Sequence, residues 1–162
     1  MAAYSGLTPE LMLDAVDAQG YRCDGRLLAL NSYENRVYQL WLEDGAVLVA
    51  KFYRPARWSD AAIREEHAYA RELEAREIPI VAPIERGGST LFEHAGYRFA
   101  LYPKRPGRTP ELEDFDTLTW LGRFIARIHA VGALRSFEHR PGLDIESFGR
   151  APLDYILEHD FV

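Results

Sequence analysis

The spacing of apolar and polar residues changes along the chain, and these changes predict where helices and strands lie. After Thr8, apolar residues recur every three or four positions behind a hydroxyl cap and a proline, which predicts a helix over 8–19. From Leu27 the apolar residues gather in short stretches rich in β-forming residue types. These stretches, LLAL, VYQLWL and VLVAKFY, predict three strands of a meander, the last two joined by the turn sequence Glu-Asp-Gly.

The pattern then continues with a long helix and two further strands. Ser59 is a favourable cap for the stretch AAIREEHAYARELEAREI, whose apolar residues fall on one face, and it predicts a helix that ends by Pro79. The stretches STLFEH and YRFALYP predict two short strands after this helix. We therefore expect an α+β fold in which five strands, joined by short links, pair antiparallel in the order β-β-β-α-β-β after the first helix.

The last third of the chain is predicted to be a connector followed by helices. Residues 104–114 are rich in proline, glycine and charge, as is typical of a linker, whereas strong helical periodicity predicts a helix over 115–131. The pattern weakens afterwards, and it predicts a short helix near 152–159. We accordingly divide the chain into a first lobe over 1–103, a linker over 104–114 and a helical part over 115–162.

The composition excludes several classes of protein. A chain of 162 residues with 48% hydrophobic and 27% charged residues is long enough for one domain with an appendage. The net charge of −6 argues against nucleic acid as a partner, because binding phosphates along a backbone needs an excess of basic residues. Cys23 is the single cysteine, so an internal disulfide is excluded. With no secretion signal and no long apolar run, we expect a soluble cytoplasmic protein that does not insert into membranes.

Three features bear on chemistry, and each has an ordinary explanation when it is taken alone. Residues 31–36 form a polar, glycine-free link between two predicted strands, which is typical of any β-turn. Lys51 lies in an apolar strand, where a lysine either reaches out to solvent or binds an anion. Glu65 and Glu66 in the next helix are either solvated or available to pair with it. Together with Val37, however, these features follow the kinase order of phosphate-covering loop, adenine-covering valine, strand lysine and helix glutamate.

The residues in and around these features resemble a known family. The runs LNSYENRVYQ, VAKFYRPARW, EEHAYARELEAREIPIVAPI, FALYPKRPGR and LGRFIARIHAVG resemble the N-terminal half of the bacterial stress-response kinase A family. The resemblance covers about residues 4–150. That family belongs to the aminoglycoside phosphotransferase and choline kinase-like group and phosphorylates serine and threonine in proteins. The resemblance therefore implies ATP and Mg²⁺ as cofactors, a five-stranded kinase N-lobe with its helix C, protein substrates, and a monomer when the protein is full length.

The resemblance also implies a role for residues of the loop and the strands. Ser32 takes the place of a phosphate-loop serine that interacts with ATP, and Asn35 takes the place of the last glycine of that loop. Val37 and Val49 would cover the adenine from the two flanking strands. Lys51 would hold the α- and β-phosphates as a fixed positive charge that positions the group to be transferred.

A second set of roles concerns the helix and the linker. The expected partner of Lys51 is Glu66 in preference to Glu65, since in related phosphotransferases the paired glutamate precedes a buried leucine by seven residues, as Glu66 precedes Leu73.

At the linker, counting back from its Pro-Gly places Pro103 and Arg105 where a backbone carbonyl and a backbone N–H normally bind the adenine. His129 is expected to be a packed residue on a helix face, with a general base as the alternative. Four arginines are either solvated or close enough to contact phosphates or a protein substrate: Arg54, Arg57, Arg105 and Arg108.

The sequence lacks the residues that such a kinase needs for phosphate transfer. These are an aspartate near the substrate hydroxyl, an asparagine five residues later and a second aspartate for Mg²⁺. The sole His-Asp pair stands at 159–160, and Asp144 precedes the position where the catalytic loop is expected. We therefore expect no catalytic or metal-binding residue in this chain, a catalytic aspartate beyond Val162, and no activity from this chain without its own C-lobe.

Two other functions remain open at this point. The first is a small-molecule kinase of the same group, acting on choline, homoserine or an antibiotic, because the N-lobe does not set the acceptor. The second is a non-catalytic interaction domain in which Lys51 and Glu66 form a merely structural ion pair.

Overall fold

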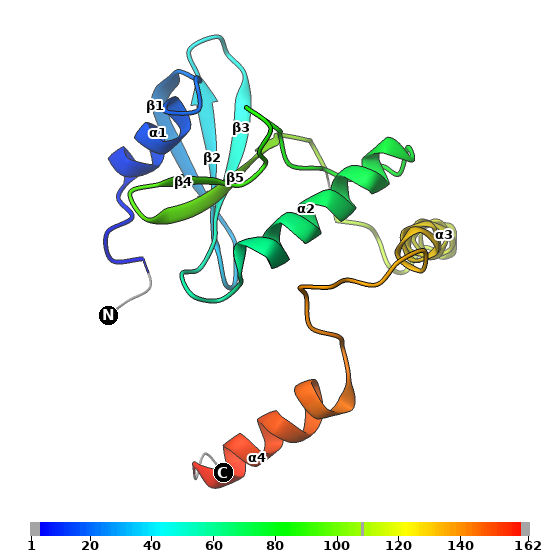
Figure 1. Cartoon of the computed structure of the whole chain (residues 1–162). Coiled ribbons are helices and arrows are strands. Elements are labelled where there is room, and N and C mark those ends of the chain that lie inside the picture. Colours follow the sequence, from blue (N-terminus) through cyan, green and yellow to red (C-terminus); the bar gives the residue numbers. More distant parts are fainter. Residues whose placement is uncertain (1–3, 108, 160–162) are drawn as a thin grey trace.

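A five-stranded antiparallel sheet forms the centre of the computed structural model, which describes residues 4–107 and 109–159 (Figure 1). The strand order is β1-β2-β3-β5-β4, with α2 between β3 and β4 in the chain, so the α+β fold predicted from the sequence is confirmed. The elements are α1 (Pro9–Asp17), β1 (Cys23–Leu30), β2 (Arg36–Leu42), β3 (Val47–Phe52), α2 (Asp60–Ala75), β4 (Phe92–His94), β5 (Tyr97–Pro103), α3 (Phe115–Gly132), η1 (Glu146–Arg150) and α4 (Ala151–Glu158).

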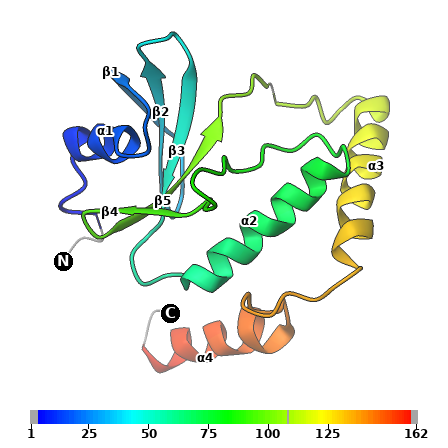
Figure 2. The ribbon, with the colours of Figure 1, turned by 45° about the horizontal axis from the view of Figure 1, so that its top comes forward.

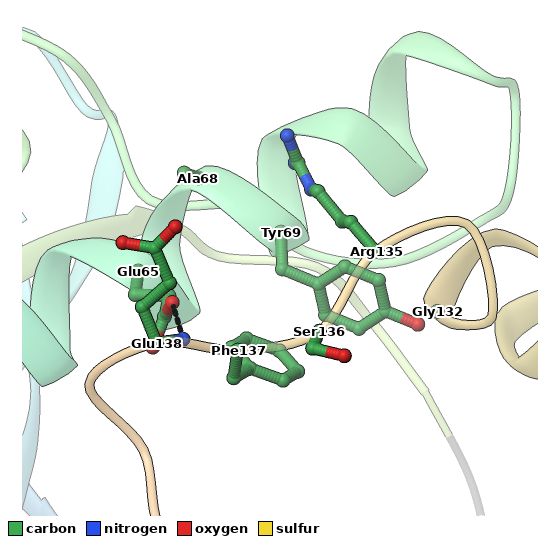
Figure 3. A pocket seen from close by; sticks show the side chains of 8 residues that line it. All are labelled: Glu65, Ala68, Tyr69, Gly132, Arg135, Ser136, Phe137 and Glu138. Atoms are coloured by element: carbon green, nitrogen blue, oxygen red, sulfur yellow. Dashed lines mark hydrogen bonds between the residues drawn. The ribbon is translucent and has the colours of Figure 1, made fainter.

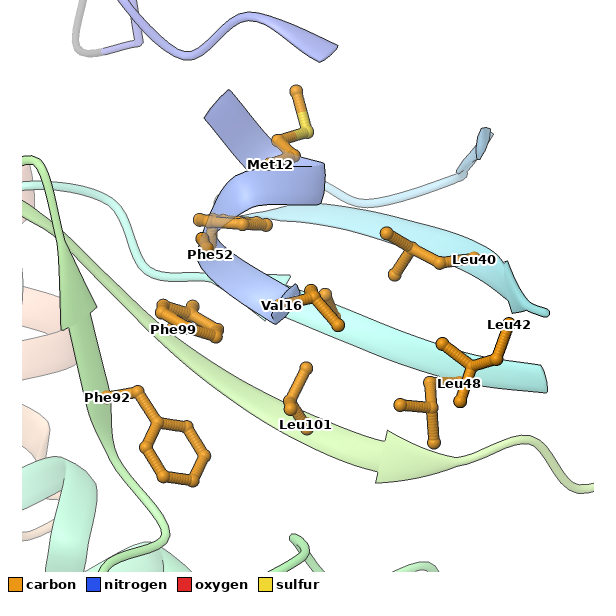
Figure 4. Close-up of a cluster of buried hydrophobic side chains, with 11 residues drawn as sticks. Met12, Val16, Leu40, Leu42, Leu48, Phe52, Phe92, Phe99 and Leu101 are labelled. Atoms are coloured by element: carbon orange, nitrogen blue, oxygen red, sulfur yellow. The ribbon is translucent and has the colours of Figure 1, made fainter. Parts of the chain in front are cut away.

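The helix α1 covers one face of the sheet and closes the main hydrophobic core (Figure 4). Its apolar residues Met12 and Val16 are one helical turn apart, so both point toward the sheet and are buried. The rings of Phe52 and Phe99, from neighbouring strands, stack at 5.2 Å beneath the helix. The buried members of this core are Met12, Ala15, Val16, Leu40, Leu42, Leu48, Ala50, Phe52, Phe92, Phe99 and Leu101.

The central strand β3 divides its side chains between the two faces of the sheet. Leu48, Ala50 and Phe52 are buried in the core under α1. Since side chains alternate along a strand, Val49 and Lys51 project from the opposite face, and both are half-buried. This face is the one on which α2 lies (Figures 1 and 2). The fold therefore places Lys51 between the sheet and the helix that follows it.

The start of α2 is set by a side-chain cap, as the sequence predicted. The Oγ of Ser59 accepts a hydrogen bond of 3.1 Å from the backbone N–H of Ala62. Further along, Ile63 and Leu73 are buried, and Ile63 packs with Tyr53 and Ala100 in a second core cluster on this face of the sheet. The cap and the buried face together fix the position of this helix.

Removing the cap is expected to destabilise the sheet and helix by about 1 kcal/mol. In Ser59→Ala the N–H of Ala62 loses its partner, whereas Ser59→Asp keeps an acceptor at the same position. The free energy of unfolding, measured in urea by tryptophan fluorescence, should fall in the first variant and hold in the second. Equal stabilities for the alanine and aspartate variants would contradict the role of the cap.

The helix α3 follows an extended connector and packs beside the C-terminal end of α2 (Figure 2). Val131 is buried with Leu73 and Ile78, and the hydroxyl of Tyr69 donates a 2.7 Å hydrogen bond to the carbonyl of Ile128. Much of the rest of this helix is exposed, including Phe115 with 79% of its surface accessible.

Two details of the C-terminal part differ from the sequence-based expectations. His129 is exposed, so the expectation of a packed histidine was wrong. The helix expected near 152–159 is observed as α4, but a π-helical turn, η1, precedes it. Asp144 accepts a 2.7 Å hydrogen bond from the N–H of Ser147 at the start of this turn, which gives it a structural task.

Candidate functional site

Lys51 and Glu66 form an ion pair on the α2 side of the sheet. The Nζ of Lys51 lies 3.2 Å from Oε1 of Glu66, and the two side chains are 23% and 34% exposed. The ammonium also lies 4.8 Å from the ring centroid of Tyr53, two residues along the same strand face. The pairing expected from the seven-residue spacing between Glu66 and Leu73 is thus confirmed.

Glu65 has a different environment, because successive helical residues point about 100° apart. Its carboxylate turns away from the sheet and accepts hydrogen bonds from the backbone N–H groups of Glu138, His139 and Arg140, at 2.6, 2.9 and 3.0 Å. Partial burial acts to raise the pKa of Glu65, but the three N–H donors outweigh it, so this pKa is lowered. Glu65 therefore binds the segment after α3, and Glu66 is the residue that pairs with Lys51.

The glycine-free loop over 31–36 is shaped by hydrogen bonds of its own side chains. The hydroxyl of Ser32 donates a 2.7 Å bond to the carbonyl of Asn35. The side-chain oxygen of Asn35 accepts a 3.3 Å bond from the N–H of Arg54, while its NH₂ group has no partner among the residues that the structure describes. Ser32 thus uses its proton inside the loop, whereas the NH₂ group of Asn35 remains available as a donor.

The loop is also held from outside. The carboxylate of Glu34 pairs with the guanidinium of Arg57, and its carbonyl accepts a 3.0 Å bond from the hydroxyl of Tyr4. Tyr33, at the tip between these anchored residues, is fully exposed. The loop therefore has fixed ends and one projecting aromatic side chain.

The two predicted adenine-covering residues share the sheet face that carries Lys51. Val37 on β2 lies directly opposite Lys51 in the register, Val49 lies two residues before it on β3, and both are half-buried. Leu28 on β1 belongs to the same face and is 51% exposed, so the apolar surface continues toward the sheet edge. This apolar surface next to Lys51 is suited to contact with a flat apolar ring.

Pro103 and Arg105 lie at the opposite end of β3 from the loop. Pro103 ends β5 and pairs with Leu48, and the next N–H, of Lys104, donates to Val47 at 3.3 Å. Arg105 follows in the exposed connector. The loop lies near Phe52, four strand residues from Leu48, a span of about 13 Å at the usual rise per residue. The predicted residues therefore lie in order along β3: the linker end with Pro103, then Val49, then Lys51, and finally the loop over 31–36.

A buried polar network that the sequence reading missed lies beside the ion pair. His67 is 1% exposed, and its ring nitrogens hydrogen-bond the hydroxyls of Tyr53 at 2.6 Å and Thr90 at 2.8 Å. Burial lowers the pKa of His67 to about 4, and burial raises that of Tyr102, which neighbours Tyr53, to about 12. His67 follows Ile63 by one helical turn, so helical spacing does signal its buried position.

The remaining candidates contribute less to this site. The Arg57 side chain pairs with Glu34 and is not free in solvent; Arg54 and Arg105 are exposed; Arg108 lies outside the described residues. Within 4–107 and 109–159, no group of three or more histidine, cysteine or acidic side chains is placed to hold a metal ion. Among the helices described, none combines the length and apolarity needed to cross a bilayer.

Comparison with known proteins decides the family. The sequence pattern of the phosphotransferase enzyme family matches residues 26–158, most of the chain. The chain belongs to the phosphotransferase enzyme family. The kinase or phosphotransferase class expected from the order of loop, lysine and glutamate is thereby confirmed.

Curated phosphotransferase relatives narrow the likeness to one branch. The chain is 44% identical over 145 residues to Stress response kinase A of Salmonella typhi, and 41% identical to that of Escherichia coli (strain K12). It is 43% identical to Serine/threonine protein kinase RdoA of Salmonella typhimurium. Each match covers 90% of this chain and 44% of the relative, so the chain spans less than half the length of these relatives.

A solved phosphotransferase structure shares the fold. Amicoumacin kinase hAmiN, in complex with AMP-PNP, Ca²⁺ and Ami, superposes with a TM-score of 0.73 over 95% of this chain and 48% of that one. The sequence identity is 21%, so the likeness concerns the fold alone.

Proposed function

We propose that this chain forms the nucleotide-binding lobe of a serine/threonine protein kinase of the stress-response type, which uses ATP with Mg²⁺. The observation that carries the proposal is the Lys51–Glu66 pair at 3.2 Å, on the α2 side of the sheet and next to the anchored loop 31–36. The identity of 41 to 44% with proteins named stress response kinase supports the branch. The printed name of one relative, a serine/threonine protein kinase, supports the acceptor class.

The residues present fit a nucleoside triphosphate. Val37 and Val49 offer half-buried apolar surface for a base, and the backbone around Pro103 offers the carbonyl that a base amino group needs. Lys51 supplies a positive charge, and the NH₂ of Asn35 supplies a free donor. These groups follow the strand in the order base, phosphates and loop, as an extended nucleotide requires.

In this proposal, Lys51 positions the phosphates of the nucleotide and does not transfer a proton. Its ammonium would bind the α- and β-phosphate oxygens while Glu66 keeps the charge in place, so the terminal phosphoryl group is directed toward the acceptor. The bound ATP with its Mg²⁺ supplies the phosphoryl group. The half-buried setting of Lys51 strengthens its attraction to phosphate, because water screens it less than on an open surface.

A titration of Mg-ATP into the 162-residue chain tests nucleotide binding. Backbone amide signals of Ser32, Lys51 and Arg105 should shift in NMR spectra, and signals of α4 should stay in place. Affinity is expected to be weak, since one lobe of a kinase contacts one side of the nucleotide. No shift at millimolar ATP would favour the alternative of a non-catalytic interaction domain.

The acceptor is tested separately, with the full-length gene product and labelled ATP. We expect transfer to serine and threonine hydroxyls of added proteins. Transfer to choline, homoserine or an aminoglycoside, with none to protein, would replace the protein kinase by a small-molecule kinase of the same family.

A further inference from the structure

The carboxylate of Glu66 binds two cations, one on each oxygen. Oε1 faces Nζ of Lys51 on β3, and Oε2 pairs with the guanidinium of Arg140. Arg140 lies 74 residues later in the chain, in the segment that follows α3. The ion pair at the site is therefore a three-membered arrangement that joins two distant parts of the chain.

Arg140 is oriented by further contacts. Its guanidinium carbon lies 4.5 Å from the ring centroid of Trp58, and its Nε donates a 3.4 Å hydrogen bond to the carbonyl of Ala62 in α2. The side chain is 26% exposed. A planar guanidinium that stacks on a ring and binds a carboxylate has little freedom left, unlike a solvated arginine.

The backbone of Arg140 is fixed beside α2 as well. The carboxylate of Glu65 accepts hydrogen bonds from three successive N–H groups over 138–140, of which Figure 3 shows the one from Glu138. Next to these bonds, the rings of Tyr69 and Phe137 meet edge to face at 5.5 Å, at a cavity of about 200 Å³ (Figure 3). The segment is thus attached to the helix that carries Glu66.

Trp58 connects this arrangement to the loop over 31–36. A second guanidinium, that of Arg57, lies 4.8 Å from the same ring centroid and pairs with Glu34 in the loop. Contacts therefore run without interruption from the loop through Arg57, Trp58 and Arg140 to Glu66.

We propose that Arg140 is a positioning residue, which holds the Glu66 carboxylate so that Oε1 faces the ammonium of Lys51. A carboxylate bound by one flexible lysine rotates between orientations, whereas a guanidinium fixed on its second oxygen selects one of them. The consequence for nucleotide affinity rests on the proposed function; the consequence for Lys51 does not. Arg140 acts through Glu66 and contacts no ligand itself.

The sequence allows a direct test, because it contains two lysines, Lys51 and Lys104. In a chain labelled with ¹³C,¹⁵N-lysine, the side-chain signals of Lys51 and Lys104 can be followed separately. Arg140→Gln should move the Lys51 signal in the direction that Glu66→Gln moves it, and leave the Lys104 signal in place. Arg135→Ala is the matched control, since Arg135 joins the same segment to Glu72 on the same helix, away from Lys51. A Lys51 signal that responds no more to Arg140→Gln than to Arg135→Ala would refute the positioning role.

Nucleotide binding gives the second readout. Arg140→Gln should weaken Mg-ATP binding about 3- to 10-fold and leave adenosine binding unchanged, with Arg140→Lys restoring part of the loss. A purely structural tether predicts equal losses of thermal stability in Arg140→Gln and Arg135→Ala and no selective loss of ATP; that result would overturn the proposal. If the unaltered chain binds no ATP, the proposed function fails, while the lysine signals still decide whether Arg140 positions Glu66 and Lys51.

Discussion

Replacing Lys51 with alanine is expected to weaken Mg-ATP binding by the 162-residue chain about 10- to 100-fold, while adenosine binding stays the same. The reason is the place of its ammonium, which pairs with Glu66 on the α2 side of the sheet, next to the loop over 31–36. A hydrogen bond to a charged group contributes about 1.5–3 kcal/mol, and adenosine has no phosphate to accept one. Dissociation constants for ATP and adenosine, from NMR titrations of the same samples, measure the difference.

The matched control for this change is Lys104→Ala. Lys104 is the second of the two lysines and is exposed in the connector, where its backbone N–H bonds Val47 and its side chain points into solvent. Its removal lowers the net charge by the same amount and should leave the preference for ATP over adenosine intact. If both alanine variants lose ATP affinity equally, the effect is one of overall charge, and Lys51 has no special role.

Acidification from pH 7.5 to pH 5 is expected to lower the free energy of unfolding by roughly 2 kcal/mol through His67. Burial holds the pKa of this histidine at about 4, against 6.5 for an exposed one. Below pH 6.5 His67 is protonated in the unfolded chain but stays neutral in the folded chain. The free energy of unfolding therefore falls until about pH 4, where His67 is protonated in the folded state too. Urea unfolding at a series of pH values measures the slope.

Glu65 and Asp144 have lowered pKa values, so their carboxylates lose their stabilising charge at a pH below this window. His67→Gln keeps hydrogen-bonding groups near Tyr53 and Thr90 without titrating, and should remove most of the slope. The His67 ring signals in NMR spectra should in turn report a neutral ring down to about pH 4. A ring that takes up its proton near pH 6.5 in the folded chain would show that burial does not control it.

Residue spacing alone predicts most of the fold, because its signals are local. The apolar stretch VLVAKFY marked the strand that is observed as β3, and the single-residue cap at Ser59 fixed where α2 begins. The π-helical turn over 146–150 escaped prediction because such turns are rare and short. The packing predicted for His129 failed for another reason: helical periodicity does not tell which face of a helix has a neighbour.

The parts of the site whose residues are close in sequence could be predicted, and the contacts between distant residues could not. Loop, lysine and glutamate follow one another within 36 residues, from Asn31 to Glu66, so their order was informative. Arg140 was missed because a contact across 74 residues depends on tertiary structure and has no characteristic spacing. His67 was missed although the sequence contains a signal for it. It follows the apolar Ile63 by one helical turn, a spacing that predicts a buried position.

The anchored loop has a thermodynamic consequence. None of residues 31–36, all of which the structure describes, has a positive φ, and the loop owes its shape to Ser32, Asn35 and Glu34. A glycine-rich loop of equal length samples far more backbone conformations in the unfolded and unliganded states. Here the entropy of ordering is lost when the chain folds. A ligand that docks against this loop therefore meets a surface already organised, and little of its binding energy is consumed in shaping it.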